Sequence, residues 1–328
     1  MAEINKKGKK KTDKKQYRGY IVGKHAFFHN LWVDIRRNKV LYIFLVIILV
    51  YFGIFHYAPM VGLVMAFEKF TPIKGFFGSK WIGLQNFRQF FTGPYIGRLI
   101  KNTVIIGVLD LLVNFPAPII FALLLNEIRL KAFKRSVQTI SYMPYFISSV
   151  VAMGLVVGFT KSGGFISEWV ARMTGGSSQN LLNSSKWFRP IYILSGTWQS
   201  VGYGSIIYLA ALSSVDQELY DAAKVDGAGR VRQCLHVTIP GITPMIIMMF
   251  IMRMGMVFSV GADKILLLYN ASNYDVSDVI NTYVYRVGML DSNFGLATAV
   301  GLFNSIIGTI MLMTSNFILK KTTEVSMF

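Results

Sequence analysis

The titratable side chains of this 328-residue chain form no recognisable catalytic motif. The four histidines, His25, His29, His56 and His236, lie far apart, and none pairs at the spacing of a zinc-binding HExxH helix. A GxxxxGK[ST] phosphate loop and a GxSxG nucleophile turn are both absent from the sequence. The single cysteine, Cys234, excludes an intramolecular disulfide and a cysteine metal cluster. We therefore expect this chain to be no enzyme and to carry no metal or cofactor of its own.

The segment 213–241 has the residue types of an ordered, functional loop rather than of a simple connection. It reads SSVDQELYDAAKVDGAGRVRQCLHVTIPG. Asp216, Glu218 and Asp221 come early in it, where a helix N-terminus favours negative charge. Gly227 then interrupts the helical pattern, and a second helical stretch ends at Pro240. The pattern predicts a helix, a glycine turn, a second helix and a proline.

Two opposite charges lie inside apolar segments of the sequence. Asp110 and Arg253 are each surrounded by residues typical of a membrane span, where an unpaired charge is costly. Their predicted depths match at about 10 and 14 Å from the outer boundary, at about 1.5 Å of rise per residue. The sequence predicts an ion pair between them, and it leaves open a role for Arg253 in contacting a transported solute.

Aromatic and amide side chains in the apolar segments are suited to binding sugars, since rings stack on C–H faces and amides bind hydroxyls. Such residues also anchor helices at the membrane interface or join helices to one another, so both interpretations stay open. Including the charged candidate, the residues proposed to line a solute path are Trp198, Gln199, Tyr203, Tyr208, Arg253 and Asn304.

The composition indicates that these residues are positioned by membrane-spanning helices. Hydrophobic residues make up 53% of the chain and charged residues 15%, with a mean hydropathy of +0.47, whereas soluble domains average about 25% charged residues. A span needs about 20 mainly apolar residues. Windows of this length occur at 41–59, 103–125, 137–159, 190–212, 242–262 and 296–318. We expect an all-α polytopic membrane protein with six transmembrane helices.

Basic residues predict the orientation of these spans. The net charge is +18, and half of it lies in an N-terminal tail, 1–40, that directly precedes the first span. By the positive-inside rule, this tail, the basic connection 126–136 and the C-terminal tail 321–328 are cytoplasmic, flanking a transmembrane domain over 41–320. The tail lacks interleaved aromatic residues, so we expect it to contact anionic membrane lipid and no nucleic acid.

The segment 213–241 resembles the EAA loop of binding-protein-dependent ABC importer permeases, whose pattern is EAA, three residues, Gly, nine residues, Ile, one residue, Leu-Pro. Asp221-Ala222-Ala223, Gly227, Val237, Ile239 and Pro240 occur at the family's spacing. WIGL at 81–84, ALLLNE at 122–127 and QTISYMPYFIS at 138–148 are similar to the carbohydrate uptake class, especially its maltose and oligosaccharide-polysaccharide branch. The resemblance covers about residues 40–320.

The resemblance implies a type I ABC importer permease fold with both termini cytoplasmic, in the bacterial cytoplasmic membrane. It implies import of oligosaccharides or polysaccharide fragments with an extracytoplasmic solute-binding protein, a second permease subunit and two copies of a cytosolic ATPase, which binds the ATP and Mg²⁺. In the family, the segment 213–241 is a coupling loop that docks into the ATPase. The residues it assigns to coupling are Glu218, Asp221, Ala222, Ala223, Asp226, Gly227, Val237, Ile239 and Pro240.

Several alternatives stay open at this point. The permease partner is either a different chain or a second copy of this one. The solute is either a sugar or another compound carried by the importer superfamily, such as a phosphodiester, a peptide or a lipid-derived molecule. A secondary transporter would need intramembrane ion ligands or paired repeats, which the sequence does not show convincingly. A membrane scaffold without transport is the remaining hypothesis, and an ATPase bound through the coupling loop separates the importer from both.

Overall fold

The structure is a computed structural model that describes residues 26–323 and Met327. The chain divides into an N-terminal unit, 1–62, and a main unit, 63–328. Each unit is built almost entirely of helices within these described residues. An all-α membrane protein was expected, and the helical architecture confirms this fold class.

The N-terminal unit consists of an amphipathic helix followed by an apolar one. Its elements are α1 (Ala26–Arg37), α2 (Lys39–Phe52), the π-helical turn η1 (Gly53–Tyr57) and α3 (Ala58–Met60). The sequence of α2, KVLYIFLVIILVYF, is apolar on every face, and none of its side chains is buried in the chain. An all-round apolar helix with no protein core to cover it is suited to lipid.

The main unit contains the remaining helices and one short β-hairpin. Its first elements are η2 (Val61–Phe67), which starts at the boundary, β1 (Glu68–Lys69), α4 (Gly75–Gly78), β2 (Lys80–Trp81), α5 (Gln85–Phe91), α6 (Ile96–Asn114), α7 (Pro116–Glu127), α8 (Lys131–Tyr142), η3 (Met143–Phe146), α9 (Ser149–Thr160) and α10 (Phe165–Thr174). The antiparallel strands pair Glu68 with Trp81 and Lys69 with Lys80.

The second half of the main unit contains the two longest helices of the described residues. Its elements are η4 (Leu181–Asn183), α11 (Ser185–Ser213), α12 (Gln217–Val225), α13 (Arg230–Gln233), η5 (Cys234–Thr238), α14 (Ile239–Gly255), α15 (Ala262–Leu268), α16 (Tyr274–Ser277), α17 (Ile280–Tyr285), η6 (Arg286–Leu290) and α18 (Phe294–Thr323).

In the described part of the chain, five helical segments are long and apolar enough to cross a membrane. They are Lys39–Phe67, Ile96–Glu127, Ser149–Thr174, Arg230–Gly255 and Phe294–Thr323. The helix α11 covers the predicted span 190–212 and has 29 residues, but it is not among the five. Its polar and small residues, in SGTWQSVGYGS, lower its hydropathy. The count of six therefore stays a prediction.

Two predicted spans differ from the observed helices. The span 137–159 is wrong as one helix, because η3 contains Pro144 and the backbone at Ile147 is extended before Ser148 caps α9. The span 242–262 is also shifted. The helix α14 begins at Ile239 and ends at Gly255, and a series of short turns follows it. At each break a backbone carbonyl accepts a side-chain hydrogen bond, Ile147 from Gln199 and Val260 from Asn281.

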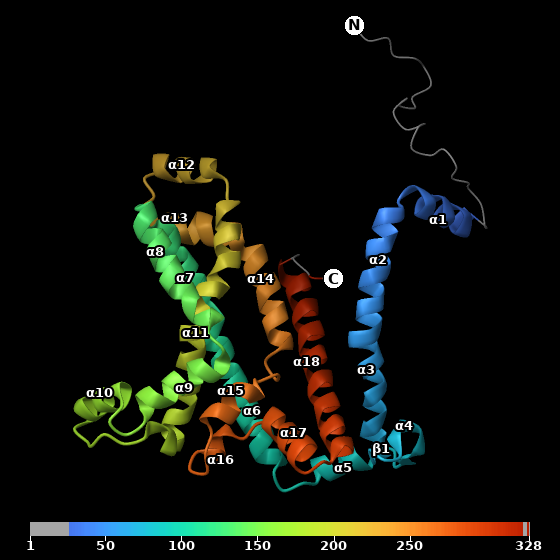
Figure 1. The fold of residues 1–328 in the computed structure, drawn as a ribbon. Coiled ribbons are helices and arrows are strands. Elements are labelled where there is room, and N and C mark those ends of the chain that lie inside the picture. The colour runs from blue at the N-terminus through green and yellow to red at the C-terminus, as the bar shows by residue number, and fades with distance from the viewer. Residues whose placement is uncertain (1–25, 324–326, 328) are drawn as a thin grey trace, which may run out of the picture. The chain divides into compact units, whose positions relative to one another are not determined.

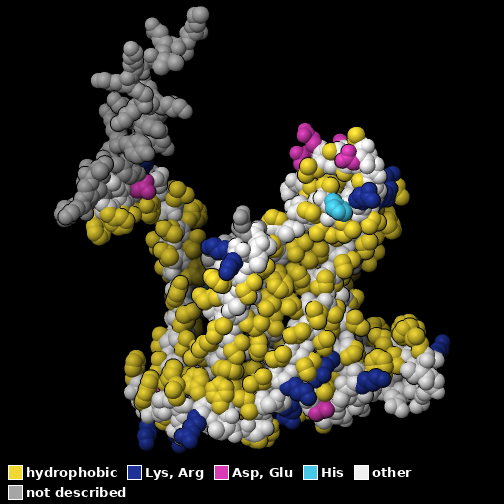
Figure 2. Space-filling view, turned by 180° about the vertical axis from the view of Figure 1, so that it is seen from behind, with side chains coloured by type: hydrophobic (Ala, Val, Ile, Leu, Met, Phe, Trp, Pro, Cys, Tyr) yellow, Lys and Arg dark blue, Asp and Glu magenta, His cyan; other side chains and the backbone are white. Residues whose placement is uncertain are grey.

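The arrangement of the main unit separates two ends (Figure 1). The helix α12 lies across one end, next to α13 and the start of α8, whereas α5, α10, α16 and α17 lie at the other. The helix α11 runs between the two ends and packs on α7 and α6, and α14 packs on α18. Hydrophobic side chains cover the middle of this unit, and Lys and Arg gather toward its ends (Figure 2). This distribution fits a membrane-embedded middle with two wetted ends.

Candidate functional site

The predicted coupling loop, 213–241, contains a capped helix, α12. The carboxylate of Asp216 accepts a hydrogen bond from the backbone N–H of Glu218 at 3.0 Å, which satisfies one of the free donors at the start of α12. Asp221 pairs with Lys224 one turn later, at 2.8 Å between Oδ1 and Nζ. This ion pair is exposed, so it contributes little to stability. The cap explains why an acid-rich segment forms a regular helix here.

Gly227 ends this helix in a left-handed conformation. Its φ is +73°, and no atom lies within 4 Å of the position that a Cβ would occupy. The N–H of Gly227 donates to the carbonyl of Lys224 at 3.0 Å, and that of Ala228 donates to Ala223 at 2.9 Å. Glycine is needed because of its backbone angle and not because a neighbour approaches closely.

Side chains of α12 and of the segment after Gly227 connect the loop to the helix bundle. Tyr220 of α12 donates its hydroxyl to Thr238 Oγ1 at 3.0 Å, and Val237 packs against the buried cluster that contains Tyr208. Arg230 of α13 lies 3.8 Å from a carboxylate oxygen of Glu127 at the end of α7. These contacts connect the loop to α7, α11 and α14.

The outer surface of α12 combines acidic and apolar side chains. Glu218, Asp221 and Asp226 are exposed, and Figure 2 shows acidic side chains gathered at this end beside hydrophobic ones. Leu219 and Val225 are 54% and 88% exposed. Of the predicted coupling residues, Ala222 and Pro240 are also exposed, whereas Ala223, Val237 and Ile239 are half-buried. This face has the composition of a docking surface for another protein.

A second candidate site is a cavity of about 800 Å³ inside the main unit. Six segments line it: α6, the 145–149 break before α9, α11, the end of α14, the turns after α14, and α15. The cavity lies beside the break before α9 and the end of α14, at positions where the sequence predicted continuous spans. Its volume is in the range of cavities that hold small ligands.

Asp110 and Arg253 form an ion pair at this cavity, so the structure brings together the two charges paired from the sequence. Arg253 Nη2 donates to Asp110 Oδ2. Asn114, one turn further along α6, donates to Asp110 Oδ1 at 2.7 Å and accepts from Thr197 of α11. The pair thus links α6 to α14 and, through Asn114, to α11.

Lys264 is a second cation at the cavity, and sequence reasoning missed it. Its Nζ donates to the backbone carbonyl of Tyr192 at 2.5 Å and lies 4.4 Å from the centre of the Tyr192 ring. Burial lowers the pKa of the Lys264 ammonium to about 8, while the charge of Asp110 acts to raise it. Lys264 lies two positions after the predicted span 242–262. Because α14 ends early, at Gly255, the chain turns and places Lys264 at the cavity.

The other residues predicted to line a solute path do not all lie at the cavity. Gln199 lines the cavity and donates to the carbonyl of Ile147 at 3.2 Å. Tyr203 stacks on Tyr145, which also lines the cavity, at 3.9 Å between ring centres. By contrast, Trp198 lines a separate apolar groove beside α9 and α10.

Two other path candidates are buried away from the cavity. Tyr208 is 3% exposed in a hydrophobic cluster. Asn304 is 6% exposed and donates to Asn281 at 3.2 Å. Neither lines the cavity formed by the described residues. Within these residues, no group of three His, Cys, Asp or Glu side chains is placed to hold a metal ion.

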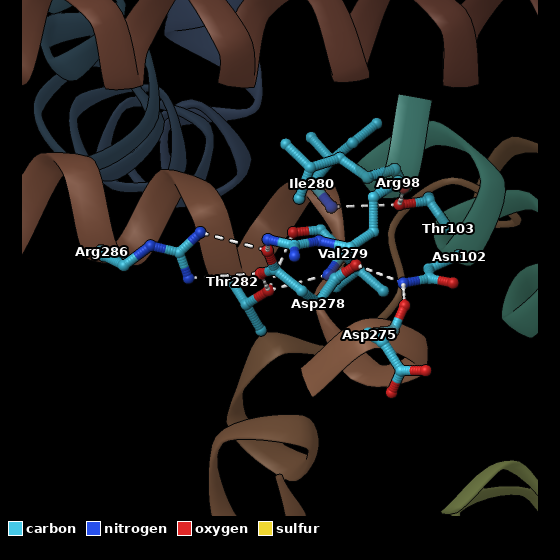
Figure 3. A network of polar contacts seen from close by, with 10 residues as sticks. Arg98, Asn102, Thr103, Asp275, Asp278, Val279, Ile280, Thr282 and Arg286 are labelled. Carbon is cyan, nitrogen blue, oxygen red and sulfur yellow. Dashed lines mark hydrogen bonds and ion pairs between the residues drawn. The ribbon is translucent and has the colours of Figure 1, made fainter. Parts of the chain in front are cut away.

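A network of polar contacts around Asp278 holds the end of the main unit opposite α12 (Figure 3). Asp278 is fully buried, and its Oδ2 lies 3.0 Å from Arg98 Nη2 and 3.2 Å from Arg286 Nη2. Thr282 donates to its Oδ1 at 2.9 Å, and Asn102 donates to its backbone carbonyl at 3.0 Å. These contacts fasten α6 to the α16–α17 segment that follows α15.

Comparisons with known proteins give a consistent family. The family described as "Binding-protein-dependent transport system inner membrane component" matches residues 114–323. The polygalacturonan/rhamnogalacturonan transport system permease protein YteP of Bacillus subtilis is 42% identical over 295 residues, which cover 90% of this chain and 92% of that protein.

Solved structures with the same fold come from an alginate importer. One is a chain of a bacterial ABC transporter involved in the import of the acidic polysaccharide alginate, with 39% identity and a TM-score of 0.82, covering 90% of this chain and 99% of that one. Another is from a bacterial alginate ABC transporter in complex with an alginate pentasaccharide-bound periplasmic protein, with 38% identity and a TM-score of 0.82 over the same shares.

Proposed function

This chain belongs to the family of binding-protein-dependent transport system inner membrane components, and on that basis we propose that it couples ATP hydrolysis by a partner subunit to oligosaccharide import. It is a multi-pass permease subunit of a sugar ABC transporter in the bacterial inner membrane. The permease is a transporter component, and the ATP and Mg²⁺ are bound by the partner ATPase.

The observation that carries the coupling role is the exposed surface of α12. This helix projects at one end of the main unit, and its acids and its apolar side chains, Leu219 and Val225, are not covered by the described chain. A capped N-terminus, the Gly227 turn and the Tyr220–Thr238 hydrogen bond hold it in place. An exposed helix that is held in this way supports docking to a cytosolic ATPase. Closure of the ATPase would then move α11 and α14 through the contacts of α12.

The cavity supports a sugar as the solute. Tyr145, Phe146 and Tyr192 supply aromatic rings, while Gln199 and Ser200 supply hydrogen-bonding groups. Relatives named for polygalacturonan, rhamnogalacturonan and alginate transport support oligosaccharides or polysaccharide fragments as the cargo. We propose that the solute enters this cavity after release from an extracytoplasmic solute-binding protein, and that a second permease subunit completes the path.

Identification of the proteins that copurify with this chain tests the proposal. The tagged chain is extracted from its native membrane in mild detergent, and its partners are identified and quantified by mass spectrometry. We expect a second permease and an ATPase with Walker motifs, in a ratio of one to one to two. A chain that emerges alone or as a homodimer, with no ATPase, under conditions that preserve a known importer, would contradict the coupling role and favour a secondary transporter.

A further inference from the structure

We propose that Lys264 binds the carboxylate of an acidic sugar in the cavity and so selects uronate-containing oligosaccharides over neutral ones. The inference rests on the proposed function, because it assigns the charge of the cargo that the permease passes. Its evidence is the arrangement of charges and donors around the cavity.

The charges that line the cavity do not balance. Arg253 is neutralised by its ion pair with Asp110, whose other oxygen accepts from Asn114. Lys264 lines the same cavity but has no carboxylate within 4 Å among the described residues. With Arg253 and Lys264 as cations and Asp110 as the acid that lines it, the cavity carries a net positive charge of one, and Lys264 is the cation outside the ion pair.

An unmatched ammonium in such a place is costly unless something compensates it. Moving a charge out of water disfavours folding, and a carboxylate partner offsets that cost. Lys264 is half-buried and is held by one strong acceptor, the carbonyl of Tyr192. A ligand with a negative charge supplies the missing counter-charge only while it is bound, which makes this position suited to recognition rather than to stability.

The geometry leaves donors for such a ligand. An ammonium group has three N–H donors, and the carbonyl of Tyr192 takes one of them. A Cβ at Gly196 would lie 2.9 Å from Lys264 Nζ, so the absence of a side chain there leaves room for the amine. Two N–H groups are thereby free of acceptors in the described chain.

The surroundings of Lys264 are those of an acidic sugar site. Tyr145 and Phe146 line the cavity and offer rings to the C–H faces of a pyranose. Ser148 and Ser149 also line it, at the N-terminus of α9, where the helix dipole adds to the positive potential. Aromatic rings with an unmatched cation fit a uronate better than a neutral hexose.

Equilibrium binding to the assembled importer tests this assignment without the solute-binding protein. The probes are radiolabelled tetrasaccharides of galacturonate and of mannuronate, each compared with its carboxyl-reduced, neutral counterpart. Lys264→Met removes the charge at similar length, and Lys264→Arg keeps it. Lys161→Met, at an exposed position outside the cavity, is the matched control. Copurification of the partner subunits verifies that each variant assembles.

We expect Lys264→Met to weaken binding of an acidic tetrasaccharide by about 10-fold or more, the magnitude of a hydrogen bond to a charged group. Binding of the neutral counterparts stays unchanged, Lys264→Arg stays within a few-fold of wild type, and Lys161→Met binds normally. Equal acid binding by wild type and Lys264→Met overturns the assignment, as does loss of acid and neutral binding by the same factor.

The outcomes also separate this inference from the function on which it rests. A wild-type complex that contains an ATPase but binds only neutral tetrasaccharides overturns the carboxylate assignment and leaves oligosaccharide import supported. A complex that lacks an ATPase and binds none of the four probes overturns both.

Discussion

At the scale of single residues, backbone angle and charge decide what the chain can do. Gly227 is required by its positive φ, since open space surrounds its Cα. Lys264 is distinguished by having no carboxylate within 4 Å among the residues that the structure describes, and not by its position in any motif. The EAA-type pattern therefore identifies the first of these residues, and only the folded cavity identifies the second.

We expect Gly227→Val to abolish or strongly reduce uptake while leaving membrane insertion intact. A β-branched residue in the left-handed region costs about 1–2 kcal/mol, which shifts the end of α12 from its docked position. Uptake of the cargo and the amount of copurified ATPase are the two measurements. Gly229→Val is the matched control because Gly229 has a negative φ and no atom within 4 Å of its Cβ position.

Gly227→Asn should recover part of the uptake, because asparagine tolerates the left-handed conformation better than valine. Normal uptake by a well-expressed Gly227→Val variant would be incompatible with the coupling role of this turn.

At the scale of elements, breaks in helices create the cavity and a charge pair joins its walls. The break before α9 and the early end of α14 open space that continuous spans would have filled. Asp110 on α6 and Arg253 on α14 then hold two of the lining elements together. The ion pair is accordingly part of the frame of the cavity, whereas Lys264 is available to a ligand.

A double-mutant cycle on Asp110→Asn and Arg253→Gln should show coupling in the thermal stability of the purified complex. Each single variant leaves a charge without its partner, so the double variant should lose less than the sum of the two. We expect a coupling energy of at least about 0.5 kcal/mol, limited by the partial exposure of both side chains.

The exposed pair Asp221 and Lys224 serves as the comparison, and the cycle of Asp221→Asn and Lys224→Gln should show no measurable coupling. Additive losses for Asp110 and Arg253 would show that their contact does not contribute in solution.

At the scale of the whole main unit, one end is built for rigidity and the other for contact with a partner. The buried carboxylate of Asp278 holds Arg98 and Arg286 and fastens α6 to the segment after α15. At the opposite end, α12 leaves acids and apolar side chains uncovered. Under the proposed coupling role, force applied at α12 would reach the cavity through the packed elements between the two ends.

We expect Asp278→Asn to destabilise the main unit strongly, because it leaves two arginines with a neutral partner at a buried site. Breaking a buried ion pair by removing one partner costs about 3–5 kcal/mol, so the unfolding temperature of the purified complex should fall sharply. Asp275→Asn, at an exposed carboxylate bonded to Ser185, should change it little. A small effect of Asp278→Asn, equal to that of the control, would refute the structural role of this network.

The sequence by itself determined the helical membrane class and the pairing of Asp110 with Arg253, and its family resemblance predicted the coupling role of the loop 213–241. Hydropathy reports a local free energy of transfer, the loop motif is contiguous, and a charge in an apolar window needs a partner wherever it lies. The ends of the helices were harder to predict from the sequence. Pro144 and the turns after Gly255 interrupt helices, but they lie in windows whose average composition is still apolar.

The tertiary structure alone decided which polar and aromatic residues share a cavity. It placed Gln199, Arg253 and Lys264 together, turned Trp198 toward an apolar groove and buried Tyr208 and Asn304 elsewhere. The physical reason is that successive residues of a helix point in different directions, and six separate segments must pack before a common interior exists. Residue type limits the chemistry a site can have, but packing selects the residues that perform it.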